Sequence, residues 1–304
     1  MRKPKLIIIT GPTASGKSEL GIKLAKKFNG EIVSADSRQI YWGMDIGTGK
    51  TQNQESIPHH GIDIADPAEE FTVAQYQKFA VEKIQEIHTR GKTPFLVGGT
   101  GLYIQSIVDN LEIPKVPPSK ALREKLEKKS EKELWEDLQR MDPKTAETLD
   151  SKNKQRLIRA LEVKLLSGIS FVSAKKIKEP YFDNLQIAIK IPREKLYKNI
   201  DRRVEQMIEQ GLEEEVKSLS EELSQKIPEE KIWSLSSLSG IGYFEFKKYF
   251  ENKIDLEEVV RLIKLHSRQY ARRQMTWFKR DKRIHWIEGF QTAEKLISEF
   301  LKKY

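Results

Sequence analysis

The chain of 304 residues contains no cysteine. This absence excludes disulfide bonds, thiolate zinc sites, iron–sulfur clusters and a cysteine nucleophile. No apolar run approaches the ~18–20 residues that a membrane-spanning helix needs, so we expect no membrane partner. The run Leu6–Thr10 behind the basic N-terminus is shorter than the ~7–15 residues of a signal-peptide core. A cytoplasmic location is therefore expected.

Acidic residues are scarce in one region near the C-terminus. The chain has 54 Lys and Arg against 45 Asp and Glu, and residues 261–283 alone hold nine basic residues and one acid. On a helix, five of these cations would lie within about 80° of one another, at ~100° per residue: Arg261, Lys264, Arg268, Arg272 and Lys279. A solvated helix face is the alternative. We expect no acidic partners on this face, which favours a polyanion.

The order of the expected elements predicts an α/β fold. Strands are expected at 6–10, 31–35, 93–97 and 185–191, and a helix at 73–88. Strands that alternate with helices are typical of a parallel sheet wrapped by helices. From 192 onward the chain is expected to be mostly helical, with one glycine-rich turn at 239–243.

A proline-rich segment marks an insertion in this fold. Residues 114–118 include three prolines, which cannot lie inside a helix or a central strand. Beyond them, 119–141 and 153–166 are charge-rich and helical in pattern. We interpret 115–183 as a small all-helical domain, inserted into an α/β core formed by 1–114 and 184–304.

The strongest motif is a phosphate-binding loop. Residues Gly11, Pro12, Thr13, Ala14, Ser15, Gly16, Lys17 and Ser18 match GxxxxGK[ST], after a predicted strand and at the start of a helix. Backbone amides and the helix N-terminus would bind phosphate there. Lys17 would reach the outer phosphate, and the Ser18 hydroxyl is placed to ligate Mg²⁺. The motif predicts a P-loop-type sheet but does not specify the phosphate compound.

Asp36 is the acidic residue best placed beside this loop. A P-loop NTPase normally carries an Asp at the end of a neighbouring strand. Here the strand at 93–97 continues into Gly98–Gly101 without an acid, whereas Asp36 follows the strand at 31–35. At this edge of the sheet it could ligate a metal, act as a general base or cap the next segment. His59 and His60 form only a weak metal candidate, because adjacent side chains point apart.

Six motifs occur in the order found in tRNA dimethylallyltransferases, and the chain resembles this family over essentially its whole length. They are GPTASGKS, ADSRQIYWGMDIGTGK, PHHGIDIADP, GGTGLY, QRLIRALEV and SRQYARRQMTWFKRD. The resemblance implies a nucleotide-kinase-like fold. It also implies transfer of the dimethylallyl group from dimethylallyl diphosphate to N6 of adenosine 37 in tRNA, with release of diphosphate. The implied partner is the tRNA anticodon stem-loop. We expect a monomer, because one tRNA arm per chain satisfies the motifs.

The resemblance also assigns roles to individual residues. Asp36 matches the general base, Thr100 the residue at the leaving oxygen, and Arg203 an arginine that neutralises the leaving group, while 11–18 match the diphosphate site. The inserted domain matches the one that grips the anticodon stem. Residues matching the stretches that touch tRNA are Asp36, Ser37, Arg38, Gln39, Gln155, Arg156, Leu157, Ile158, Arg159, Gly240, Ile241, Gly242, Tyr243, Arg268, Arg272, Arg273, Gln274, Trp277 and Lys279. Departures from the usual family residues are Arg38, Trp42, Lys154 and Phe244.

Two alternatives use the same features differently. A P-loop nucleotide kinase would bind nucleotides at the loop, but the sequence lacks a second candidate metal-binding Asp. A non-catalytic RNA-binding protein gated by nucleotide would explain the basic segment. The aromatic residues Trp277 and Phe278 have two alternative roles, stacking on bases or packing in the core, and the sequence does not decide between them.

Overall fold

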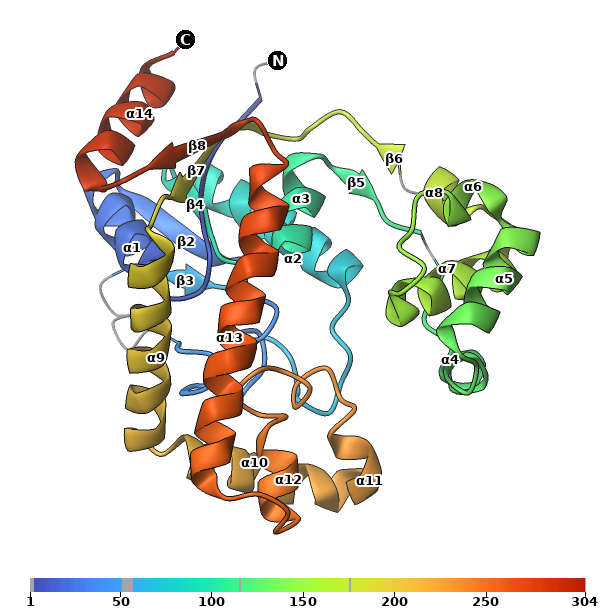
Figure 1. The fold of residues 1–304 in the computed structure, drawn as a ribbon. Coiled ribbons are helices and arrows are strands. Elements are labelled where there is room, and N and C mark those ends of the chain that lie inside the picture. Colours follow the sequence, from blue (N-terminus) through green and yellow to red (C-terminus); the bar gives the residue numbers. More distant parts are fainter. Residues whose placement is uncertain (1–2, 51–56, 115, 175, 304) are drawn as a thin grey trace. The chain divides into compact units, whose positions relative to one another are not determined.

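The computed structural model describes residues 3–50, 57–114, 116–174 and 176–303. The chain divides into two compact units, a larger one of 1–108 with 181–304 and a smaller one of 109–180 (Figure 1). The smaller unit thus begins at 109 rather than 115 and ends at 180 rather than 183; residue 115 itself lies outside the described residues. None of the described helices has both the length and the apolar character needed to cross a bilayer.

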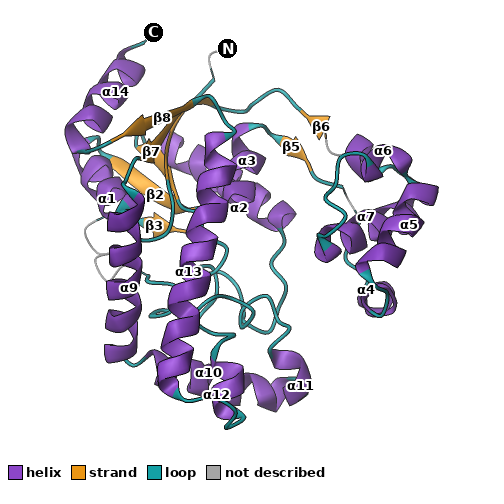
Figure 2. Ribbon diagram, in the orientation of Figure 1, coloured by secondary structure: helices purple, strands orange, loops and turns teal. Residues whose placement is uncertain are grey.

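The larger unit is built on a six-stranded sheet in the order β3-β2-β4-β1-β7-β8, with parallel pairing throughout its described ladders. Figure 2 shows strands of this sheet, among them β2, β3, β7 and β8, beside the helices of the unit. Its strands are β1 (Lys5–Thr10), β2 (Gly30–Ser34), β3 (His59–His60), β4 (Thr93–Val97), β7 (Asp183–Ile189) and β8 (Ile284–Ile287). The edge strands β3 and β8 were not expected from sequence. Each is very short, and β8 lies among charged residues where helix was expected; its pairing with β7 makes it a strand.

Helices cover both faces of the sheet, because alternate residues of each buried strand point to opposite sides. Leu6 and Ile8 of β1 pack with residues of α2 (Val73–Thr89) and α3 (Gly101–Val108). Ile7 and Ile9 pack with residues of α1 (Lys17–Lys27) and α14 (Phe290–Lys302). All four side chains are fully buried, and each contributes about 1.5–3 kcal/mol from burial.

A third group of helices builds a separate apolar core in the same unit. It comprises α9 (Arg193–Glu209), α10 (Leu212–Lys226), α11 (Glu229–Ile232), α12 (Phe246–Phe250) and α13 (Leu256–Lys279). The long helix α13 begins where Asp255 accepts a hydrogen bond from the Glu258 N–H at 2.8 Å, as N-cap residues do. Its predicted helical segment at 261–279 is confirmed.

The smaller unit is helical apart from one short strand pair. Its helices are α4 (Lys120–Glu127), α5 (Glu131–Met141), α6 (Pro143–Ala146), α7 (Lys154–Ser167) and α8 (Phe171–Ala174). The pattern at 119–141 forms two helices rather than one, because Ser130 and Glu133 form a capping box that starts α5. The expectation of an all-helical domain is wrong in one detail: β5 (Leu111–Glu112) and β6 (Lys176–Ile177) pair antiparallel.

Candidate active site

The phosphate-binding loop lies between β1 and α1, as its motif predicts. Ala14 has φ +58°, an uncommon conformation for a residue with a side chain, and such strain is typical of functional loops. No side chain caps the first turn of α1, so its amide groups remain available for an anion. Within the described part of the chain, the buried Ser15 Oγ also has no hydrogen-bond partner.

Gln274 of α13 holds this loop against the loop that follows β4. Its Oε1 accepts a hydrogen bond from Thr13 N at 2.8 Å, and its Nε2 donates to Gly99 O at 2.9 Å. The side chain is buried, and both of its polar groups are used. From α9, Asn199 Nδ2 donates to Ala14 O at 3.2 Å. Gln274 thus links the phosphate loop to the loop that follows β4.

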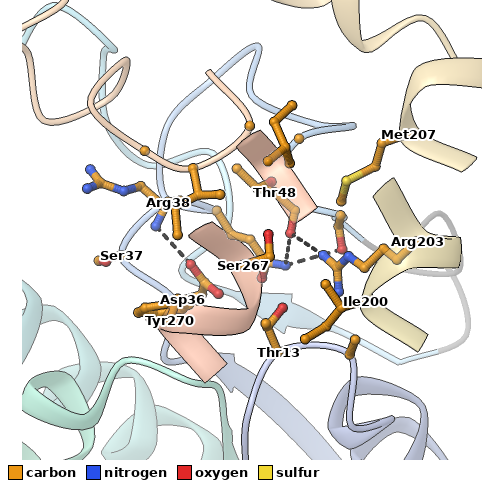
Figure 3. Close-up of a pocket in the computed structure, with 18 of the residues that line it drawn as sticks. Thr13, Asp36, Ser37, Arg38, Thr48, Ile200, Arg203, Met207, Ser267 and Tyr270 are labelled. Carbon is orange, nitrogen blue, oxygen red and sulfur yellow. Dashed lines mark hydrogen bonds between the residues drawn. The ribbon is translucent and has the colours of Figure 1, made fainter. Parts of the chain in front are cut away.

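The loop opens into a cavity of about 310 Å³ that gathers residues from distant parts of the chain (Figure 3). A volume of this size is within the range of small-ligand pockets. The predicted site residues that line it are Thr13, Ala14, Lys17, Ser18, Asp36, Ser37, Arg38, Gln39, Arg203, Gly240, Ile241, Gly242, Tyr243, Arg273 and Gln274.

Two partly buried cations, Lys17 and Arg203, lie near the Asp36 carboxylate on the cavity wall. Burial lowers the pKa of Lys17 to about 8; Asp36 opposes this shift and Arg203 adds to it. Burial also lowers the pKa of Arg203, again opposed by Asp36. Arg203 Nη2 donates to Thr48 O at 3.1 Å. An anion bound beside Lys17 and Arg203 would compensate this positive charge.

Asp36 lies just beyond β2 on the cavity wall, beside Tyr270 of α13 (Figure 3). Its Oδ1 accepts a hydrogen bond from Arg38 N at 2.9 Å, which holds the turn. Burial, reinforced by Asp36, raises the pKa of Tyr270 to about 12, so the phenol remains a hydrogen-bond donor at neutral pH. Sequence reasoning did not single out Tyr270, although it lies one helical turn before Arg273 and Gln274.

Thr100 is not among the residues that line this cavity. Its hydroxyl accepts a hydrogen bond from Ser37 N at 3.0 Å, and its own N–H donates to Ala35 O at 3.0 Å. It therefore supports the turn that carries Asp36. The predicted contact between Thr100 and the leaving oxygen stays a prediction.

The cavity also has an apolar wall that sequence reasoning missed. Ile200, Val204 and Met207 of α9, with Ile263 of α13, also line it. Their spacing is that of an ordinary helix face packed in a core. Only the packing of α9 on α13 shows that part of this face borders a ligand cavity.

The basic face of α13 is only partly free. Arg261 pairs with Glu258 at 2.6 Å, Lys264 pairs with Glu205 of α9 at 2.5 Å, and Arg268 pairs with Asp201 of α9. The expectation that this face has no acidic partners is therefore wrong for three of its five cations. Its other two members, Arg272 and Lys279, are exposed, and the described residues include no ion-pair partner for either.

Some of the residues expected to contact tRNA are buried in cores. Leu157 and Ile158 of α7 pack inside the smaller unit, so the expected RNA contact of their side chains is wrong. On the same helix Gln155 and Arg156 are exposed, whereas Arg159 bonds to the buried Glu162 and to the Val116 carbonyl oxygen. In the larger unit, Phe278 is in the core and Trp277 packs against that core, which favours the packing role.

A parallel sheet that presents a phosphate loop to a charged cavity defines the class of P-loop α/β proteins. Within this class the chain belongs to the IPP transferase family. A model of that family matches residues 39–281, and a second model, described as isopentenyl transferase, matches residues 4–61. Together the two matches extend from β1 to the end of α13.

Relatives of similar length support this assignment. A tRNA dimethylallyltransferase of Caldanaerobacter subterraneus is 44% identical, covering 98% of this chain and 97% of that protein. One of Pelotomaculum thermopropionicum is 42% identical over 99% of this chain and 96% of its own length. Among solved structures, a tRNA isopentenylpyrophosphate transferase of Bacillus halodurans is 38% identical with a TM-score of 0.71, covering 98% and 96% of the two chains. A eukaryotic dimethylallyltransferase acting on tRNA is 31% identical with a TM-score of 0.78, covering 98% and 77%. The expected kinase-like P-loop fold agrees with these structures.

Proposed function

We propose that this chain transfers the dimethylallyl group of dimethylallyl diphosphate to N6 of adenosine 37 in tRNA and releases diphosphate. The observation that carries this proposal is a single cavity with three complementary parts: the cations Lys17 and Arg203, the carboxylate of Asp36, and an apolar wall. The names of the relatives agree with a dimethylallyl donor and a tRNA acceptor.

The cationic end suits the diphosphate. As the C–O bond to the dimethylallyl group breaks, negative charge moves onto the diphosphate, and positive charge develops on the allylic carbon. Lys17, Arg203 and the amides of the loop would stabilise the departing oxygens, which is preorganised electrostatic catalysis. The apolar wall formed by Ile200, Val204 and Met207 would hold the five-carbon group and exclude water.

The Asp36 side of the cavity suits the adenine. The N6 amine is a weak nucleophile because its lone pair is delocalised into the ring, and it becomes acidic once it attacks carbon. Asp36 would accept the N6 proton, a role that typically contributes ~10²–10⁴ in rate. The base would have to leave its stack to enter the cavity. Residues such as Tyr243 and Gln274 could meet RNA only through an inserted base.

The residues present also fit Mg²⁺, which prefers oxygen ligands. The Ser18 hydroxyl lines the cavity and would be the protein ligand of the ion. Among the described residues, no group of three or more His, Cys, Asp or Glu could hold a metal alone, so we propose that diphosphate oxygens and water complete the shell. When bound, the ion would neutralise charge on the diphosphate.

Outside the cavity, we propose that the exposed cations of α13 and the exposed face of α7 contact the anticodon stem-loop. Arg272 and Lys279 are the candidates on α13, and Gln155 and Arg156 those on α7. The unit of 109–180 would grip the stem, as the resemblance implies. Binding of one tRNA arm per chain is compatible with a monomer. A tRNA substrate is compatible with a cytoplasmic location.

Direct analysis of the product tests the reaction. The protein is incubated with an unmodified tRNA transcript, Mg²⁺ and dimethylallyl diphosphate, and the nucleosides are analysed by mass spectrometry. We expect an adenosine heavier by one dimethylallyl group, absent when position 37 is changed to guanosine. Unmodified adenosine with tRNA bound would overturn the proposal, and phosphorylation of a mononucleotide by ATP would favour a kinase.

A second prediction concerns the phosphate contacts of α13. Replacing Arg272 and Lys279 together by Gln should weaken binding of all tRNAs alike, because backbone contacts do not read sequence. Each lost contact should flatten the slope of log K against log salt by ~0.7–0.9, measured by fluorescence anisotropy. The matched control replaces Arg261 and Lys264, which already have acidic partners, and should keep the wild-type slope. Equal effects of the two double variants would assign no special role to the free cations.

A further inference from the structure

Glu215 of α10 is a carboxylate held by groups from two different loops, although neither the reaction nor the family motifs assign it a role. Its Oε2 accepts hydrogen bonds from Asp45 N at 2.9 Å and Ile46 N at 2.7 Å. Its Oε1 accepts from Gly47 N at 3.0 Å and from the Tyr243 hydroxyl. Four donors thus converge on one half-buried anion.

The first loop held in this way supports Arg203. The residues after Gly47 present the Thr48 carbonyl oxygen to Arg203 Nη2 at 3.1 Å, and Gln39 Nε2 donates to the same oxygen at 3.4 Å. The loop fits closely against the guanidinium: a Cβ built on Gly49 would lie 2.2 Å from Arg203 Nη2. A displacement of this loop would therefore move the partner of a cation in the leaving-group site.

The second loop contributes Tyr243, which lies on the cavity wall and is 1% exposed. Burial, with a further contribution from Glu215, raises the pKa of Tyr243 well above its usual value, so the phenol stays a donor. The ring lies against the first loop, since a Cβ on Gly47 would be 2.5 Å from Tyr243 Cε2. The same carboxylate thus fixes both loops, and each sterically limits the other.

We propose that Glu215 is a positioning residue for the leaving-group site, which it stabilises by holding the loop 45–49 in the register that supports Arg203. The inference rests on the proposed function, because it assumes that Arg203 faces the departing diphosphate. Glu215 itself does not line the cavity, so its effect would act through Thr48 and Arg203.

The test is a double-mutant cycle between Glu215→Gln and Arg203→Met, with kcat for prenyl transfer as the readout. Gln keeps the size of Glu but replaces an anion with an amide, whose NH₂ group would face two of the four donors. We expect Glu215→Gln to lower kcat by ~10–100-fold, the scale of a small misplacement in an active site. In the Arg203→Met background the same change should cost less than about 2-fold, because interacting residues are not additive.

The matched control is Glu213→Gln, two residues away on the same helix. Glu213 also accepts a hydrogen bond from a tyrosine, Tyr249, at 2.9 Å, but neither residue lines the cavity. It should leave kcat unchanged. Full additivity of the cycle, or an equal loss in the Glu213→Gln variant, would overturn the positioning role.

Two further measurements keep the test decisive. If Glu215→Gln does not fold, Tyr243→Phe is the alternative variant, because it removes one of the four hydrogen bonds without changing the packing. We expect Tyr243→Phe to lower kcat by a smaller factor, and this factor should likewise shrink in the Arg203→Met background. A loss of kcat that is unaffected by that background would contradict the inference. Calorimetric binding of inorganic diphosphate gives the same cycle without turnover. A wild-type protein that modifies no tRNA would overturn the proposed function alone, and the diphosphate cycle would still decide the role of Glu215.

Discussion

Replacing Asp36 by Asn should lower the rate of dimethylallyl transfer by roughly 10²–10⁴-fold, while tRNA and dimethylallyl diphosphate bind at near wild-type affinity. The substitution keeps an oxygen that can accept the hydrogen bond from Arg38 N, so the turn after β2 should persist. What it removes is the ability to accept a proton from N6. Single-turnover kinetics with saturating tRNA measures this loss apart from binding.

The same variant separates a base from a metal ligand. Loss of a ligand should weaken binding of the diphosphate, and a higher Mg²⁺ concentration should partly restore the rate. Loss of a base should do neither; removal of a negative charge near Lys17 and Arg203 should, if anything, strengthen binding of an anion. A defect that Mg²⁺ rescues would assign Asp36 to the metal.

Replacing Lys17 by Met should raise the Kd for dimethylallyl diphosphate by roughly 10–100-fold, since a charge-assisted hydrogen bond to a buried anion is lost. The effect on kcat/KM should be larger, about 10²–10³-fold or more, because the same contact strengthens as charge develops on the leaving oxygens. Met preserves the length of the side chain, so packing against the loop should change little. Binding of tRNA alone should be unaffected; loss of tRNA binding with retained diphosphate affinity would mean that the loop is misassigned.

The pH dependence of wild-type binding provides an independent check. Burial lowers the pKa of Lys17 to about 8 in the free protein, and a bound diphosphate favours the charged form. Affinity should therefore be constant below pH 8 and decline as the pH rises through 8, by at most tenfold per pH unit. Calorimetry across this range measures the decline. The Lys17→Met variant should lack it, and an unchanged decline in that variant would assign the titration to another group.

Local patterns in the sequence were sufficient to predict much of the secondary structure of this protein and its phosphate loop. Apolar runs at 6–10, 31–35, 93–97 and 185–191 all became strands of the sheet, within two residues of the expected bounds. The phosphate loop lies where its motif requires. These features depend on residues that are close together in the sequence, because the hydrophobic periodicity of a helix or a strand is visible within a few residues. Where a pattern was short or charged, as in β8, local preference failed because the pairing partner determined the outcome.

The site itself required long-range contacts. Gln274 meets Thr13 across 261 residues of sequence, Arg203 meets Thr48 across 155, and Glu215 meets Gly47 across 168. No spacing rule encodes such pairs, so the apolar wall and the role of Tyr270 were also beyond reach. Neither could the sequence show that Asp201 and Glu205 of α9 neutralise part of the basic face of α13. The sequence by itself determined the phosphate loop, the alternation of strands and helices typical of an α/β fold, and the family motifs, because each is a local pattern along the chain. Only the tertiary structure decided which cations remain free, which predicted contacts are buried, and which side chains surround the cavity, because those properties depend on contacts between elements that are not neighbours along the chain.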